Sequence, residues 1–69
     1  MMGEQEAIVV GVRPLTIHGM AYVDLAVVHR DRSVSEARLG PESVPDHLSE
    51  GETVLVTKVA NMVISVRRP

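Results

Sequence analysis

The chain contains no cysteine, no Phe and no Trp, and Tyr22 is its single aromatic residue. Without cysteine, neither a disulfide nor a thiolate metal site can stabilise the fold. A chain of 69 residues forms one domain and buries only about 60% of its unfolded surface, so its core is thin. We therefore expect stability to come from a small β-barrel and from contacts with partners.

Long apolar segments and an excess of positive charge are also missing. No apolar run approaches the ~20 residues that a membrane-spanning helix needs, and the first ten residues, MMGEQEAIVV, are acidic where a signal peptide is basic. The net charge of −2 creates no general attraction for nucleic acid or anionic lipid. These features predict a cytoplasmic protein without membrane insertion.

The apolar residues that are present are rich in Val and Ile, which favour strands. Residues 1–6 are polar and expected to be flexible, and residues 7–69 form one domain. The predicted strands are Ala7–Val12, Met20–His29, Ser33–Leu39, Glu52–Val59 and Met62–Arg67.

Glycine, proline and asparagine mark the predicted breaks between these strands. Gly11 indicates a bulge, and Pro14 is expected to limit strand pairing beyond it. Gly19 suits a turn that needs a positive φ. Pro41 favours a short helical turn, and Asn61 is expected to take the left-handed position of the last hairpin.

Three strands, a short helical turn between strands three and four, and two more strands are the element order of the OB-fold. The predicted fold is therefore all-β, a small five-stranded OB-like barrel. An SH3-like barrel has a similar size and a late helical turn, and it stays open as the alternative.

The end of the chain resembles the C-terminal OB domain of NfeD-type proteins, which are partners of stomatin-like membrane proteins. The residues that carry this resemblance are Gly51, Val54, Val56, Val59, Asn61, Met62, Ile64 and Val66. Those domains usually have Gly where this chain has Asn61. The resemblance implies a small OB barrel.

A second set of residues is similar to HypC-type hydrogenase-maturation chaperones, which are also small OB-like barrels. This set comprises Ala21, Val23, Asp24, Arg32, Val34, Leu39, Gly51, Glu52, Val54, Leu55 and Val56. The chaperones hold metal-centre intermediates through an N-terminal Met-Cys, whereas this chain begins Met1-Met2-Gly3. That chemistry therefore does not transfer.

The polar residues do not form a recognisable catalytic or cofactor-binding motif. His18, His29 and His47 lack the short-spaced pair that is usual in zinc sites, and neither phosphate-loop spacing nor a nucleophile elbow occurs. Asp24 lies in an apolar stretch, where a raised pKa would suit catalysis, but pairing with an arginine is the more economical prediction. We expect a protein without enzymatic activity, metal or cofactor.

Nucleic-acid binding is the alternative function for an OB-like barrel, whose second and third strands often form the binding face. Such a face stacks bases on aromatic side chains in a basic groove. The residues available for it are Tyr22, Arg30, Arg32 and Arg38. Asp31 and Glu36 interrupt the positive charge, which weakens this alternative.

A surplus of apolar residues favours protein contact as the main function. Val28, Leu55 and Val63 alternate with residues predicted to face the core, so we expect them on the surface, where contiguous apolar area marks association sites. Tyr22 is a candidate anchor, because tyrosine is enriched at interface hot spots. The sequence thus predicts an assembly module whose partner is itself or another protein.

Overall fold

Five strands and one short 3₁₀ helix make up the computed structural model, which describes residues 2–69. The elements are β1 (Met2–Ile17), β2 (Met20–His29), β3 (Val34–Leu39), η1 (Pro41–Ser43), β4 (Thr53–Val59) and β5 (Met62–Arg67). The 3₁₀ helix begins with a proline, whose fixed φ suits the first helical position. The all-β fold class is therefore confirmed, with the expected helical turn between β3 and β4.

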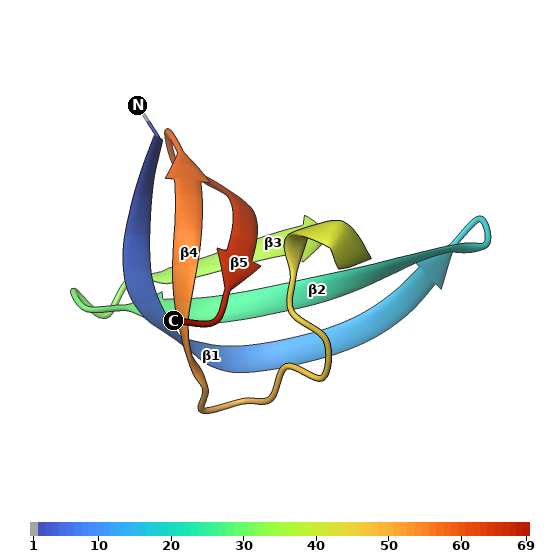
Figure 1. Cartoon of the computed structure of the whole chain (residues 1–69), viewed down its shortest axis with the longest axis horizontal. Coiled ribbons are helices and arrows are strands. Elements are labelled where there is room, and N and C mark those ends of the chain that lie inside the picture. The colour runs from blue at the N-terminus through green and yellow to red at the C-terminus, as the bar shows by residue number, and fades with distance from the viewer. Residues whose placement is uncertain (1) are drawn as a thin grey trace.

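All strand pairs are antiparallel, and the five strands form one sheet in the order β3-β2-β1-β4-β5 (Figure 1). The fourth strand returns to lie beside the first, which is the Greek-key arrangement of OB barrels. The end strands β3 and β5 lie close together, but no hydrogen-bonded ladder joins them within residues 2–69. The barrel is thus OB-like and incompletely closed.

The first strand is much longer than the sequence indicated, because it pairs with two different neighbours. Residues 2–8 pair with β4, and nearly the whole strand from Ala7 onward pairs with β2. Residues 2–6, which we expected to be flexible, are therefore part of the sheet. The predicted bulge is confirmed, since the register shifts between Val9 and Gly11. The strand bends strongly along its length (Figure 1).

Pairing continues past Pro14, which lies opposite Val23 in β2, so the expectation that proline would limit it was wrong. Pairing with β4 ends at Ile8, Val9 adds two hydrogen bonds with Gly51 and Glu52, and the strand beyond Val9 is an edge in the described chain. Because Ile17 and Met20 flank a two-residue turn as a hydrogen-bonded pair, alternation makes Pro14–Val23 a non-hydrogen-bonded pair. The missing N–H of Pro14 would point to the free edge, where it is tolerated.

The two-residue turns that join β1 to β2 and β4 to β5 obtain their left-handed backbone from different residues. His18 and Gly19 have φ values of 50° and 77°, as a type I′ turn requires at both positions. Beyond the rest of the sheet, β1 and β2 run on together to this turn as a two-stranded arm (Figure 1). In the β4–β5 turn the positive φ, 54°, belongs to Ala60. The expectation that Asn61 would take this role was therefore wrong.

The core consists of small aliphatic side chains contributed by all five strands. Its buried members are Ala7, Val9, Leu25, Val27, Leu39, Val54, Val56, Val63 and Val66. Val63 was expected on the surface but is only 9% exposed. The reason is a register shift between Thr57 and Lys58 opposite β5, which breaks the simple alternation. Met62 and Ile64, expected inside, are exposed instead.

None of the helical structure within residues 2–69 has the length and apolar character that crossing a membrane requires.

Candidate functional site

The side of β1, β2 and β3 that faces away from the core carries the most distinctive surface of the described chain, and we call it the outer face. Cross-strand register places its residues in rows. In order along β2, from the arm toward the β2–β3 turn, these rows are Ile17–Met20, Leu15–Tyr22, Arg13–Asp24–Arg38, Gly11–Ala26–Glu36 and Ile8–Val28–Val34.

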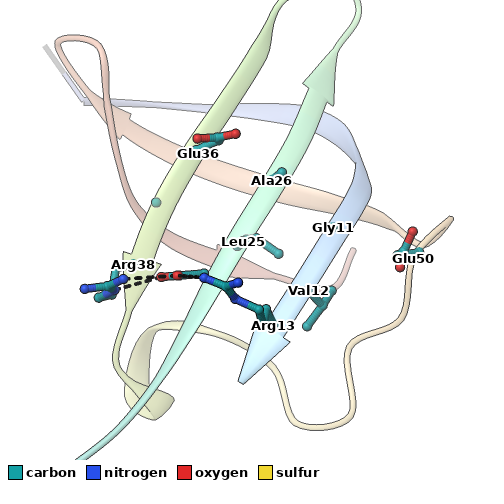
Figure 2. A pocket seen from close by; sticks show the side chains of 10 residues that line it. Gly11, Val12, Arg13, Leu25, Ala26, Glu36, Arg38 and Glu50 are labelled. Carbon is teal, nitrogen blue, oxygen red and sulfur yellow. Dashed lines mark hydrogen bonds and ion pairs between the residues drawn. The ribbon is translucent and has the colours of Figure 1, made fainter. Parts of the chain in front are cut away.

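The central charged row is held together by Asp24. Arg38 donates to both carboxylate oxygens of Asp24, from Nε at 2.8 Å and from Nη2 at 3.1 Å. Arg13 adds a longer contact, with its Nη2 3.4 Å from Oδ2. Figure 2 shows the two guanidinium groups approaching the carboxylate from neighbouring strands on either side.

The protonation of Asp24 follows from these contacts. The hydrogen bonds from Arg38, aided by its positive charge and by Arg13, lower the pKa of Asp24 and outweigh the opposing effect of desolvation. The same hydrogen bonds raise the pKa of Arg38. The prediction that Asp24 pairs with arginine is confirmed, and its lowered pKa is the opposite of what a general acid needs.

Beside the charged row the outer face is hollowed. Gly11 and Ala26 have almost no side chains, and they line a shallow hollow of about 630 Å³ together with the charged row and Glu36 (Figure 2). A Cβ built on Gly11 would lie 3.4 Å from the Cβ of Ala26, so the two residues form a close, low floor. The hollow is open to solvent and can accept side chains of another molecule.

Apolar rows lie on both sides of this polar centre. On one side, Ile8 and Val34 flank Val28 and are 46% and 59% exposed. On the other side, Leu15 lies opposite Tyr22 on the arm, and both are half-buried. The Tyr22 hydroxyl reaches 3.9 Å from the sulfur of Met20. Partly exposed apolar side chains mark a candidate association site, and on this face they form two rows separated by a charged centre.

The four predicted interface residues separate in the structure. Tyr22 and Val28 share the outer face, in the two apolar rows described above. Leu55 lies elsewhere, half-buried in β4 between Glu6 and Arg67. Val63 is in the core. The structure therefore does not bring the four side chains into one patch.

The alternative nucleic-acid residues are also dispersed. Tyr22 and Arg38 are in neighbouring rows of the outer face. Arg30 and Arg32 follow the end of β2, eight and ten residues after Tyr22 in the chain. Eight residues of strand span about 26 Å, so both arginines lie far from Tyr22. Arg30 is 3.9 Å from Glu6. A continuous basic groove through all four residues is therefore not formed.

A second hollow, of about 580 Å³, lies near the β2–β3 turn and includes His29 and Lys58 in its lining. His29 is buried, and its Nε2 is 2.7 Å from the Ser35 hydroxyl. Its Nδ1 has no hydrogen-bond partner among residues 2–69. His18 and His47 lie in exposed turns, and no cluster of potential ligands able to hold a metal ion occurs in this range.

Sequence reasoning missed Arg13, Glu36 and the Gly11–Ala26 floor. A signal for Arg13 was present: once a two-residue turn is placed at His18–Gly19, simple counting puts Arg13 opposite Asp24. Glu36 lies on β3, whose register depends on the longer loop from Arg30 to Ser33. Counting from the sequence does not fix that register.

Comparisons with known proteins found no match to a family model, to a curated protein or to a solved structure.

Proposed function

We propose that this protein is a non-enzymatic interaction module that assembles through its outer face, most simply with further copies of itself. The observation that carries the proposal is the presence of apolar rows on both sides of the charged row of β1, β2 and β3. Ile8, Met20 and Val34 are 46%, 61% and 59% exposed there. A thin core gains stability when such residues are covered by a partner.

The face is a better contact surface than the free edge of β1. Edge-to-edge pairing needs backbone N–H groups along the edge. Proline has no N–H group, so the β1 edge lacks this hydrogen-bond donor at Pro14. The likenesses to NfeD-type domains and HypC-type chaperones agree with a role in protein contacts and stay predictions. The cytoplasm as the location of this protein is also part of the proposal, and cell fractionation tests it.

Binding of single-stranded nucleic acid is the second candidate, favoured by the position of Tyr22 beside Arg38 on the face that OB proteins use. Asp24 engages Arg38 with two hydrogen bonds, and Glu36 adds negative charge in the next row. Electrostatic binding weakens steeply with salt. Titration with a labelled oligonucleotide at low and moderate salt separates this function from apolar assembly, which persists in salt.

Light scattering over a concentration series, at low and at high salt, tests the proposed assembly. We expect a concentration-dependent rise in mass that persists at high salt. Val34→Asp, on the outer face, should abolish this rise. Met62→Asp is the matched control, because Met62 is equally apolar and 69% exposed but lies at the β4–β5 turn. A monomer at every concentration, or equal effects of the two variants, would refute the proposal.

A further inference from the structure

The rows of the outer face are arranged almost symmetrically about its middle. The charged row Arg13–Asp24–Arg38 is next to the small row Gly11–Ala26–Glu36, and an apolar row follows on each outer side. Reversing the direction of β2 therefore exchanges one adjacent apolar row with the other. It also places two of the three charged side chains over the small residues and the third, Arg38, over Glu36. A surface of this kind is complementary to itself under a two-fold rotation.

We propose that the outer face binds a second copy of this chain, packed face to face with the two β2 strands antiparallel. The two-fold axis passes between the rows of Asp24 and Ala26. This proposal rests on the assembly function proposed above and specifies its geometry.

The central rows then fit by both size and charge. Arg38 lies opposite Glu36 of the second copy, and the symmetry repeats this pair on the other side of the axis. Arg13 lies over Gly11 of the second copy, so its long side chain enters the hollow that the missing side chain leaves. Asp24 lies over Ala26 and keeps its hydrogen bonds from Arg38. The hollow of about 630 Å³ thus receives the charged row of the other molecule.

The outer rows supply the apolar contact. Val28 faces Tyr22 of the second copy, and Ile8 faces Leu15. Each pair buries side chains that are half-buried or exposed in the single chain. Tyrosine against an aliphatic side chain is a favourable contact between facing sheets, and its hydroxyl can stay at the rim.

Charge also selects the antiparallel orientation over the parallel one. If the β2 strands ran parallel, the charged rows would face each other, with Asp24 opposite Asp24 and each arginine opposite an arginine of the other copy. Facing like charges are destabilising. In the antiparallel arrangement Arg38 instead lies opposite Glu36 of the second copy, so opposite charges face each other.

The size of the face predicts a weak, reversible dimer. In the antiparallel arrangement the overlapping rows run from Tyr22 to Val28, six residues of β2 or about 20 Å, and the three strands measure about 10 Å between their outer backbones. This backbone footprint is well below the roughly 800 Å² per partner of a standard interface. We expect weak association that needs a high protein concentration, with rapid exchange of subunits between dimers.

Cysteine cross-linking tests the geometry, and the natural chain has no cysteine to interfere. One preparation carries Tyr22→Cys and the other Val28→Cys. Facing sheets pack about 10 Å apart, which is too far for a direct disulfide, so a short bismaleimide reagent is used. The usual crossing of about 30° shifts these positions sideways by only about 5 Å.

We expect cross-linked dimer when the two preparations are mixed and little when either is treated alone. In the antiparallel arrangement like positions are six residues of strand apart, or about 20 Å. Thr57→Cys mixed with Val28→Cys is the control, because Thr57 lies on β4 outside the outer face, and it should give no product. Circular dichroism confirms that each variant is folded. Ala26→Arg provides a second test: it fills the hollow and should raise the dissociation constant at least tenfold.

The outcomes separate this geometry from the assembly function. Product from Tyr22→Cys alone would indicate parallel strands and overturn the proposed orientation. A dimer by light scattering without product in the mixture, or a dimer unaffected by Ala26→Arg, would mean that another surface is used. A monomeric natural chain at all concentrations would refute the assembly function itself.

Discussion

The β4–β5 turn offers a direct test of the backbone, because Ala60 has a φ of 54°. An L-residue with a Cβ in the left-handed region costs about 1–2 kcal/mol, and glycine avoids this cost. Glycine also gains freedom in the unfolded chain, which costs about 0.4–1 kcal/mol. The difference predicts that Ala60→Gly raises the free energy of unfolding by about 0.5–1 kcal/mol. For a domain of this size, the thermal midpoint should rise by about 2–8 °C.

Urea denaturation and thermal unfolding followed by circular dichroism measure this change. Ala21→Gly is the matched control: Ala21 is exposed in β2 and pairs with Thr16, so the same change should cost about 0.5–1 kcal/mol there. Opposite signs for the two variants would support the left-handed backbone at Ala60. If Ala60→Gly destabilised the protein as much as Ala21→Gly, the reasoning would be refuted. Both measurements belong at one protein concentration, since assembly shifts apparent stability.

Two further outcomes follow from the core and from the ion pairs. Val56→Ala changes a fully buried position and should lower the free energy of unfolding by about 2–3 kcal/mol, because apolar burial is lost and a cavity is left. Urea denaturation measures this change. A loss below about 0.5 kcal/mol would contradict the place of Val56 in the core. The pKa values of three carboxyl groups, Asp24, Glu4 and Glu52, are lowered, chiefly by hydrogen bonds from Arg38, Arg67 and Arg68 respectively. The stability that these carboxylates contribute is therefore fully present above their unfolded pKa values, near about pH 4. It is lost as the pH falls through their lower pKa values in the folded protein. The thermal midpoint should therefore fall below about pH 4, and less steeply for Asp24→Asn; an unchanged acid slope would show that Asp24 makes no contribution.

Strands bounded by strong turn signals were predictable from the sequence. The second and fifth strands have the predicted ends, Met20–His29 and Met62–Arg67, because a short turn terminates each Val-rich run. The first strand was predicted too short, since residues 3–6 have no apolar side chain that would mark them as part of a strand. Their pairing with β4 depends on a partner about 50 residues away, which local patterns do not report.

The facing of side chains was predictable only where the pleat is regular. In β2 strict alternation put Tyr22 and Val28 on the same face, as the structure shows. In β5 the register shift opposite Thr57 and Lys58 exchanged the faces and placed Val63 in the core. A bulge is a property of two paired strands, so the sequence of one strand does not reveal it.

The candidate site depends on register even more strongly than the fold does. The pairing of Asp24 with an arginine was expected from its apolar surroundings. That the partners are Arg13 and Arg38 follows from two separate hairpins that meet on β2. The hollow beside them exists because Gly11 and Ala26 are opposite each other, a coincidence of two small residues that neither strand shows alone.

The double pairing of β1 also determines how the chain can fold. The first half of β1 pairs with β4, which follows it by about 50 residues along the chain. The β1–β2–β3 meander can form early, but it leaves Ala7 without its neighbour Val54 in β4 until the β4–β5 hairpin docks. Contacts between distant segments slow folding, so the rate-limiting event should be the docking of β4 onto a preformed meander. A nascent chain released before that step would expose half of its core.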